Sequence, residues 1–144
     1  VFDQDMQGDP GSDRRILDVL ARFKIRCISK DTNANTITHY ADSTLKHVKR
    51  VVRALKEEFP NAEISTRKVA LVSAIGSDMQ VPGILAKTVT SLAEEEISVL
   101  ALHQCMRQVD MQFVIDEDHY EKAIAKLHAT LIEPHNHEYA IVAA

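Results

Sequence analysis

An internal repeat divides this 144-residue sequence into two similar halves. Gly11 is followed 14 residues later by Ile25, and Gly83 is followed at the same distance by Ile97, an offset of 72 positions. Apolar residues recur at this offset in two stretches of each half, with the i, i+3, i+4, i+7 spacing of one helix face. In the later stretch they are Val48, Val51, Val52 and Leu55, matched by Tyr120, Ala123, Ile124 and Leu127. Two long copies indicate a duplicated domain, because solenoid repeats are shorter and more numerous.

Each half is small, so the apolar core that it can bury is limited. We therefore expect the halves to pack against each other or against a second chain. The formal net charge of -4 gives no reason to expect nucleic acid or an anionic membrane as a partner. No apolar run approaches the roughly 20 residues of a membrane span, and there is no secretory h-region.

The sequence has two cysteines, Cys27 and Cys105. They form neither a disulfide framework nor a metal-binding spacing, which favours a reducing cytoplasm as the location. The sequence starts without Met at Val1, inside a predicted strand. We therefore interpret it as a fragment whose missing N-terminal part holds the rest of the function.

Each half is predicted to read strand, helix, strand, strand, helix, strand. In the first half these elements cover residues 1–5, 12–24, 26–30, 36–41, 43–59 and 62–66, with a turn at 31–35. In the second half they cover residues 68–75, 83–95, 98–104, 108–115, 118–131 and 139–143. A βαββαβ unit places two helices on one face of a four-stranded antiparallel sheet, the ferredoxin-like arrangement. The predicted fold class is therefore α+β, with two tandem ferredoxin-like domains at 1–67 and 68–144.

No catalytic motif is recognisable in either half. The sequence has no Gly-rich phosphate loop, no Ser-His-acid pattern and no convincing Cys–His pair. The histidines His128, His135 and His137 lack the tight ligand pairs of zinc sites, and a solvated C-terminal turn explains the last two. A helix face is basic without interleaved aromatics, which favours a solvated face over nucleic-acid binding. Its residues are Lys46, His47, Lys49, Arg50, Arg53 and Lys56.

The loops before the first helix of each half are better candidates for a binding site. A helix N-terminus offers unpaired N–H groups and partial positive charge, which suit a carboxylate. Gly8 and Gly11, and Gly76 and Gly83 in the second half, allow close approach of a small ligand to the backbone. An amino acid would offer its carboxylate to those amides and its ammonium to Asp9 or Asp31. The alternative is that these glycines only make the strand-to-helix turn.

Several segments carry a resemblance to a known family. They are Lys68 to Gly76, Pro82-Gly83-Ile84, Glu96 to Leu100, Gln104 to Ile115 and Ala123 to His128. A βαββαβ unit with such a Pro-Gly loop resembles the ACT domain, a regulatory module for small ligands. Two in tandem resemble the C-terminal regulatory region of aspartate kinases (aspartokinases), in which Leu-His at the end of the last helix is typical.

The resemblance implies a function for the protein as a whole. A preceding kinase domain, absent here, would use ATP and magnesium to phosphorylate aspartate, so the chain itself carries no catalytic site and needs no cofactor. The tandem domains would bind an end product of lysine or threonine biosynthesis, pair as a homodimer through their sheets and control the activity. Two alternatives stay open: a structural dimerisation module without an effector, and the amino-acid-sensing region of another biosynthetic enzyme.

The resemblance also implies effector-binding positions. In the first half they are Met6, Gly8, Asp9, Gly11, Ser12, Cys27, Ile28, Asp31, Thr32 and Asn33. The N–H groups near Gly11 and Ser12 would hold the α-carboxylate, and the carbonyls around Cys27 would take the α-ammonium. The corresponding loop of the second half is Ser77, Asp78, Met79, Gln80, Val81 and Gly83. Lysine-inhibited relatives often carry Ser-x-Asp followed by Thr-Ser-Glu, and here that acidic residue is missing or displaced, so a variant insensitive to lysine is a second expectation.

Overall fold

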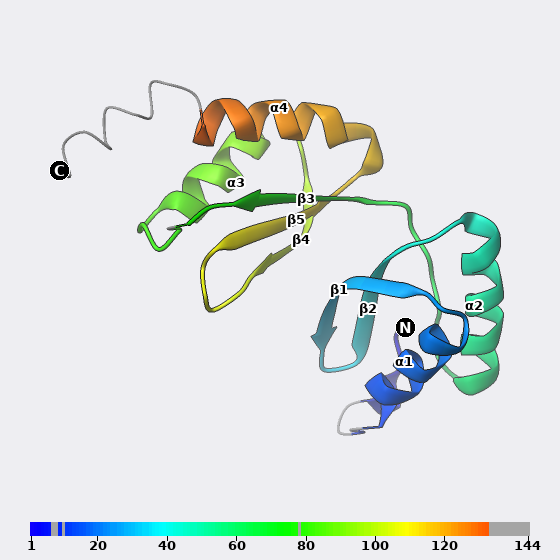
Figure 1. Ribbon diagram of the computed structural model, residues 1–144. Helices are drawn as coiled ribbons and strands as arrows, with labels where there is room; N and C mark the ends of the chain where they lie inside the picture. The colour runs from blue at the N-terminus through cyan, green and yellow to red at the C-terminus, as the bar shows by residue number, and fades with distance from the viewer. Residues whose placement is uncertain (7–8, 10, 78, 133–144) are drawn as a thin grey trace. The chain divides into compact units, whose positions relative to one another are not determined.

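The computed structural model describes residues 1–6, 9, 11–77 and 79–132, and the chain forms two compact units (Figure 1). The first unit is Val1–Thr66 and the second is Arg67–Ala144. The predicted domain limits, 1–67 and 68–144, stay predictions. Arg67 donates to Asp116 of the second unit, with 2.8 Å between the guanidinium nitrogen and the carboxylate oxygen.

The first unit contains two helices and a small antiparallel sheet. Its elements are η1 (Gln4–Met6), α1 (Ser12–Arg22), β1 (Arg26–Asn33), β2 (Thr36–Asp42) and α2 (Leu45–Glu58). β1 pairs with β2, and Phe2 bridges both Thr36 and Glu63. The order across the sheet is therefore β1, β2, Phe2, Glu63, as a ferredoxin-like unit requires. The predicted strands 1–5 and 62–66 are shorter than expected: their pairing consists of the two isolated bridges of Phe2, because the chain turns into η1 at Gln4.

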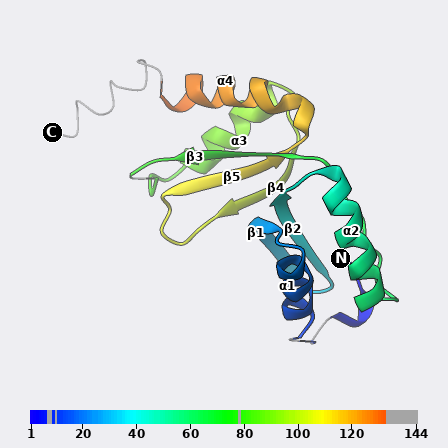
Figure 2. The same ribbon diagram turned by 45° about the vertical axis from the view of Figure 1, so that its right-hand side comes forward.

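The second unit repeats this arrangement, and here the first strand, unlike the segment at Phe2, pairs along its whole length (Figure 2). Its elements are β3 (Ala70–Ile75), α3 (Ile84–Glu94), β4 (Val99–Gln104), β5 (Asp110–Ile115), η2 (Glu117–His119) and α4 (Tyr120–Leu131). The sheet order is β3-β5-β4 with antiparallel pairing, and α3 and α4 lie on one face of it (Figures 1 and 2). The predicted strand 139–143 lies outside the described residues. Both units confirm the predicted α+β class.

The two units bury equivalent apolar faces, as the repeat predicts. In the first unit the core contains Ile16 and Val19 from α1, which are 1% exposed, and Val51 and Leu55 from α2. In the second unit it contains Leu92, Phe113, Ile115, Ala123 and Leu127. The helix patterning correctly places Val51 and Leu55 of α2 and Ala123 and Leu127 of α4, because apolar burial dominates the packing of such small units. On α1 it is only partly right: of the residues that the repeat aligns, Leu20 is buried, whereas Leu17 and Ala21 are exposed.

The repeat also extends to backbone detail at the end of the first helix of each unit. Lys24 and Glu96, which are 72 positions apart, have left-handed φ angles of 54° and 58°. The next residues, Ile25 and Ile97, donate their N–H groups to Leu20 and Leu92 at 2.9 and 3.0 Å. This hydrogen bond closes the helix and turns an apolar side chain back into the core, as in a Schellman cap.

A bulge is duplicated as well. The pairing of β1 with β2 skips Ile28, and the pairing of β4 with β5 skips Leu100 at the equivalent position. Both residues are exposed apolar side chains, 50% and 41% exposed respectively. A bulge bends the strand and increases its twist, so both sheets curve at the same point.

Candidate functional site

A hollow of about 370 Å³ lies in the first unit, between the segment before α1 and the β1–β2 hairpin. It is lined by Met6, Asp9, Asp13, Thr32, Asn33, Ala34 and Ile37. Four predicted effector positions, Met6, Asp9, Thr32 and Asn33, come together here from two segments far apart in sequence. Sequence reasoning missed the other three lining residues.

The hairpin that forms one wall of this hollow differs from the prediction. Residues 31–33 belong to β1, and the turn is only Ala34-Asn35. The predicted turn at 31–35 is therefore wrong for Asp31, Thr32 and Asn33. Asp31 faces Tyr40 across the hairpin and accepts a 2.7 Å hydrogen bond from its hydroxyl. Burial and this bond raise the pKa of Tyr40 to about 12.

Asp9 occupies the N-terminus of α1 itself. Its Oδ1 accepts the Gly11 N–H at 3.0 Å, and its Oδ2 accepts the Ser12 hydroxyl at 2.6 Å. Arg15 adds an ion pair at 3.2 Å. The Ser12 hydroxyl, the Gly11 N–H and Arg15 together lower the pKa of Asp9. The Gly11 N–H, expected to hold an effector carboxylate, is thus bonded to a carboxylate of the chain, and a ligand would have to displace it.

Gly11 is needed for space and not for an unusual backbone. Its φ is -87°, which any residue adopts. A Cβ at this position would lie 3.2 Å from Asp9 Oδ1, tighter than ordinary packing. Gly83 is the opposite case: its φ of 88° favours glycine, while the space around it is open.

Asp13 forms the second charged group of the hollow. Its Oδ2 pairs with Lys30 Nζ, which joins α1 to β1. Its Oδ1 lies 3.7 Å from His39 Nε2 on β2, and both of these atoms are buried without a hydrogen-bond partner. Burial lowers the pKa of His39, against the opposing effect of Asp13. Each carboxylate that lines the hollow is therefore already matched by a cation.

The other predicted positions of the first half that the structure describes do not line the hollow. Cys27 is half-buried and donates its thiol to the Ser29 carbonyl at 3.2 Å, and burial raises its pKa. Ile28 lies at the bulge of β1. Gly8 lies outside the described residues. An effector contact by Cys27, Ile28 or Asp31 stays a prediction.

The described residues of the predicted second loop line neither this hollow nor the one described next. Met79 is 6% exposed and packs in the core of the second unit, whereas Val81 is 55% exposed. Ser77 and Gln80 are exposed at the surface. Asp78 lies outside the described residues.

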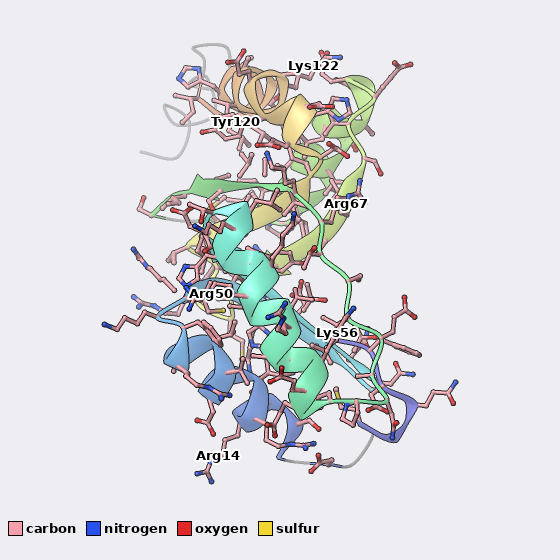
Figure 3. The ribbon with its side chains drawn as sticks, turned by 90° about the vertical axis from the view of Figure 1, so that its right-hand side faces the viewer. Arg14, Arg50, Lys56, Arg67, Tyr120 and Lys122 are labelled. Atoms are coloured by element: carbon pink, nitrogen blue, oxygen red, sulfur yellow. The ribbon has the colours of Figure 1, made fainter. Side chains whose placement is uncertain are left out.

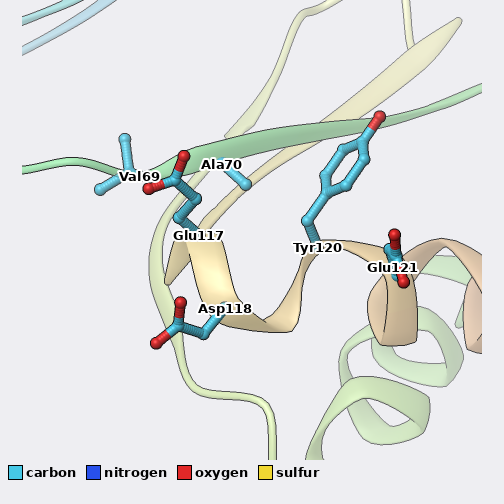
Figure 4. Close-up of a pocket in the computed structure, with 6 residues that line it drawn as sticks. All are labelled: Val69, Ala70, Glu117, Asp118, Tyr120 and Glu121. Carbon is cyan, nitrogen blue, oxygen red and sulfur yellow. The ribbon is translucent and has the colours of Figure 1, made fainter.

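A second hollow, of about 380 Å³, lies in the second unit (Figure 4). Val69, Ala70, Glu117, Asp118, Tyr120 and Glu121 line it. Three carboxylates and no basic side chain form its polar lining, although Lys68 pairs with Glu117 at 3.3 Å. Such a lining repels the carboxylate of an amino acid, so the hollow of the first unit is the better candidate.

The basic face of α2 is largely exposed, as a solvated face is, and its His47 ring packs edge-on near Phe23. Arg50 and Lys56 project from the helix (Figure 3), and the Arg50 guanidinium lies 5.6 Å from the ring centre of Phe23. Within residues 1–6, 9, 11–77 and 79–132, no group of three His, Cys, Asp or Glu residues could hold a metal ion. His135 and His137 lie outside that part of the chain. No helix there is long and apolar enough to cross a membrane.

Comparison with known proteins shows what the chain is similar to. Residues 63–129 match the ACT domain model. The whole chain is 51% identical to the aspartate kinase Ask_Ect of Stutzerimonas stutzeri strain A1501, of which it spans 30%. The aspartate kinase of Clostridium acetobutylicum superposes with a TM-score of 0.85 at 17% identity, over 93% of this chain and 32% of that one. E. coli aspartokinase III, solved with lysine and aspartate, superposes with a TM-score of 0.72 at 20% identity, over 92% of this chain and 30% of that one.

These likenesses agree with one another and confirm the resemblance seen in the sequence. The two structures share the fold, and the sequence identity to Ask_Ect extends across both units. The chain is similar over its whole length to the ACT-domain regulatory regions of aspartate kinases.

Proposed function

We propose that this chain regulates an aspartate kinase by binding an end-product amino acid, lysine or threonine, in the hollow of the first unit. The observation that carries the proposal is the convergence of Met6, Asp9, Thr32 and Asn33 on one hollow. The kinase domain, with ATP and magnesium, would lie in the rest of a longer cytoplasmic protein. The amino acid would bind one conformational state of the kinase more tightly than the other. A coupling free energy of about 1–3 kcal/mol would then change kinase activity about 5- to 150-fold.

The charges around the hollow favour threonine over lysine. E. coli aspartokinase III has been solved with lysine. In this chain the carboxylate of Asp9 is engaged by Arg15, and that of Asp13 by Lys30. A lysine side chain would bring a second ammonium beside these cations with no free carboxylate to receive it. A threonine hydroxyl needs only a hydrogen bond, which Thr32 or Asn33 can provide.

Isothermal titration of the chain with L-threonine and L-lysine tests this proposal. We expect saturable binding of threonine and weaker or undetectable binding of lysine. Asn33→Ala should weaken threonine binding, whereas Asn61→Ala, an exposed asparagine of the same unit outside the hollow, should leave it unchanged. Equal loss in both variants, or no binding of either amino acid, would reject an effector site in this hollow.

Dimerisation without an effector is the second candidate function. The observation that favours it is a set of exposed apolar side chains on the sheet edges of the second unit. Leu100 and Leu102 on β4 are 41% and 40% exposed, and Ile75 at the end of β3 is 78% exposed. Exposed apolar groups of this kind mark contact surfaces. Analytical ultracentrifugation would find a dimer for either function, so the amino-acid titration distinguishes the two.

A further inference from the structure

Two buried polar atoms of the first unit face each other without a hydrogen bond. They are Oδ1 of Asp13, on the first turn of α1, and Nε2 of His39, on β2. The distance of 3.7 Å is too long for a hydrogen bond, and the His39 side chain is only 8% exposed. Such atoms are costly unless some state of the protein satisfies them.

Charged groups approach His39 from three directions. Asp13 faces it from α1, and Lys30 is its cross-strand neighbour on β1. The ammonium group of Val1, which donates to the Ile37 carbonyl at 2.8 Å, adds a second positive charge. One anion therefore opposes two cations and the burial of the ring. Their balance keeps the pKa of His39 low and leaves the imidazole neutral at neutral pH.

We propose that His39 is a proton-controlled positioning residue for the hollow that Asp13 lines. When His39 takes up a proton, Nε2–H becomes a donor directed at Asp13 Oδ1, and the two groups close to hydrogen-bond distance. The Asp13 carboxylate then shifts from Lys30 towards β2. No other acceptor for this proton is found near Nε2 within the described residues.

This movement would change ligand binding in the hollow; this step rests on the proposed function. Asp13 lines the hollow together with Thr32 and Asn33. A protonated His39 adds a positive charge behind the hollow and withdraws negative charge from its lining. The ammonium of a bound amino acid is then held less strongly. Binding should therefore weaken as the pH falls through the pKa of His39, by about fivefold or more.

The first arm of the test uses no ligand. NMR titration of the chain should give one midpoint for the His39 imidazole and for the backbone amides of Thr32 and Asn33. In Asp13→Asn the His39 midpoint should fall, because the carboxylate that favours the charged ring is gone. In His39→Gln the amides should no longer titrate at that midpoint. Amides that are indifferent to His39, or a His39 midpoint unchanged in Asp13→Asn, would overturn the proposal.

The second arm measures L-threonine affinity by calorimetry at two pH values that bracket the His39 midpoint found in the first arm, which should lie below the ordinary histidine pKa of about 6.5. We expect a loss at the lower pH of about fivefold in the parent and in His47→Gln, and none in His39→Gln. By thermodynamic linkage, bound threonine must weaken proton binding to His39 by the same factor, which lowers the titration midpoint of His39. If His39→Gln does not fold, Asp13→Asn replaces it.

The two arms separate this inference from the function on which it rests. Threonine binding that is equally strong at both pH values overturns the control by His39 and leaves the effector site intact. Absence of binding by threonine and by lysine overturns the effector site. In that case the ligand-free titration still decides whether His39 positions Asp13.

Discussion

Replacing Lys24 or Glu96 by glycine should stabilise the chain. Both residues hold left-handed φ angles, of 54° and 58°, and neither side chain has an ion pair or hydrogen bond within the described residues. Left-handed backbone costs an L-residue about 1–2 kcal/mol, and glycine removes this strain. Glycine also raises the entropy of the unfolded chain, which offsets about 0.4–1 kcal/mol of that gain. Each substitution should therefore raise the free energy of unfolding by about 0.5–1 kcal/mol.

Urea unfolding followed by far-UV circular dichroism measures this change. Lys49→Gly is the matched control, because Lys49 is an exposed residue of α2. There glycine should destabilise by about 1 kcal/mol. Lys24→Gly and Glu96→Gly must change stability in the same direction, since they occupy equivalent positions of the repeat. If Glu96→Gly destabilises the chain as much as the control does, the duplicated helix end described above is incorrect.

Three further predictions concern pH, the core and the first loop. The pKa of His39 is lowered on folding, so the unfolded chain binds more protons and the free energy of unfolding should fall as the pH drops below about 6.5. Thermal melts should show that the melting temperature falls less steeply with pH in His39→Gln. Leu92 is fully buried and Leu100 is 41% exposed, so urea unfolding should show a loss of about 2–5 kcal/mol for Leu92→Ala and a much smaller one for Leu100→Ala. Gly11→Val should fold, because the φ of Gly11 is -87°. The valine side chain should displace Asp9 and weaken threonine binding about tenfold, measured by calorimetry. Unchanged affinity would place the site elsewhere.

The fold could be predicted in most of its elements because the repeat supplies two independent readings of the same pattern. Apolar spacing located the helices and the residues that they bury, such as Val51 and Leu55. The first and last strands of the first unit were less predictable. At Phe2 the run of apolar and acidic residues suits a strand, yet the chain enters η1 two residues later and Phe2 makes two isolated bridges in place of a ladder.

The hairpin shows why part of the site could not be predicted. Asp31, Thr32 and Asn33 have turn-forming composition, but they continue β1 because Ala34-Asn35 suffices for a tight turn. This register puts Lys30 opposite His39 and brings His39 next to Asp13. A one-residue slip in this register would move these side chains to the other face of the sheet. Because the sequence analysis placed the turn at 31–35, it could not predict that His39 and Asp13 lie together.

Asp13 could have been found from the sequence. It lies in the first turn of a predicted helix, where acidic residues are favoured. It also follows Asp9 by four residues, a spacing that brings side chains close together in a helix. An Asp just before a helix also favours capping, but the bonds from Gly11 and Ser12 to Asp9 depend on a side-chain rotamer and could not have been predicted. That engagement is what turns an apparently vacant helix N-terminus into one already satisfied.

The most direct test of effector binding in the first unit is an NMR titration of the isotope-labelled chain with L-threonine. We expect saturable shifts of the backbone amides that surround the hollow, above all Asp9, Thr32 and Asn33, and small shifts around Leu102 on β4. Shifts that centre on Ser77 to Gly83 would move the effector site to the second unit. Absence of saturable shifts with threonine and with lysine would contradict amino-acid binding and leave the chain as a dimerisation module.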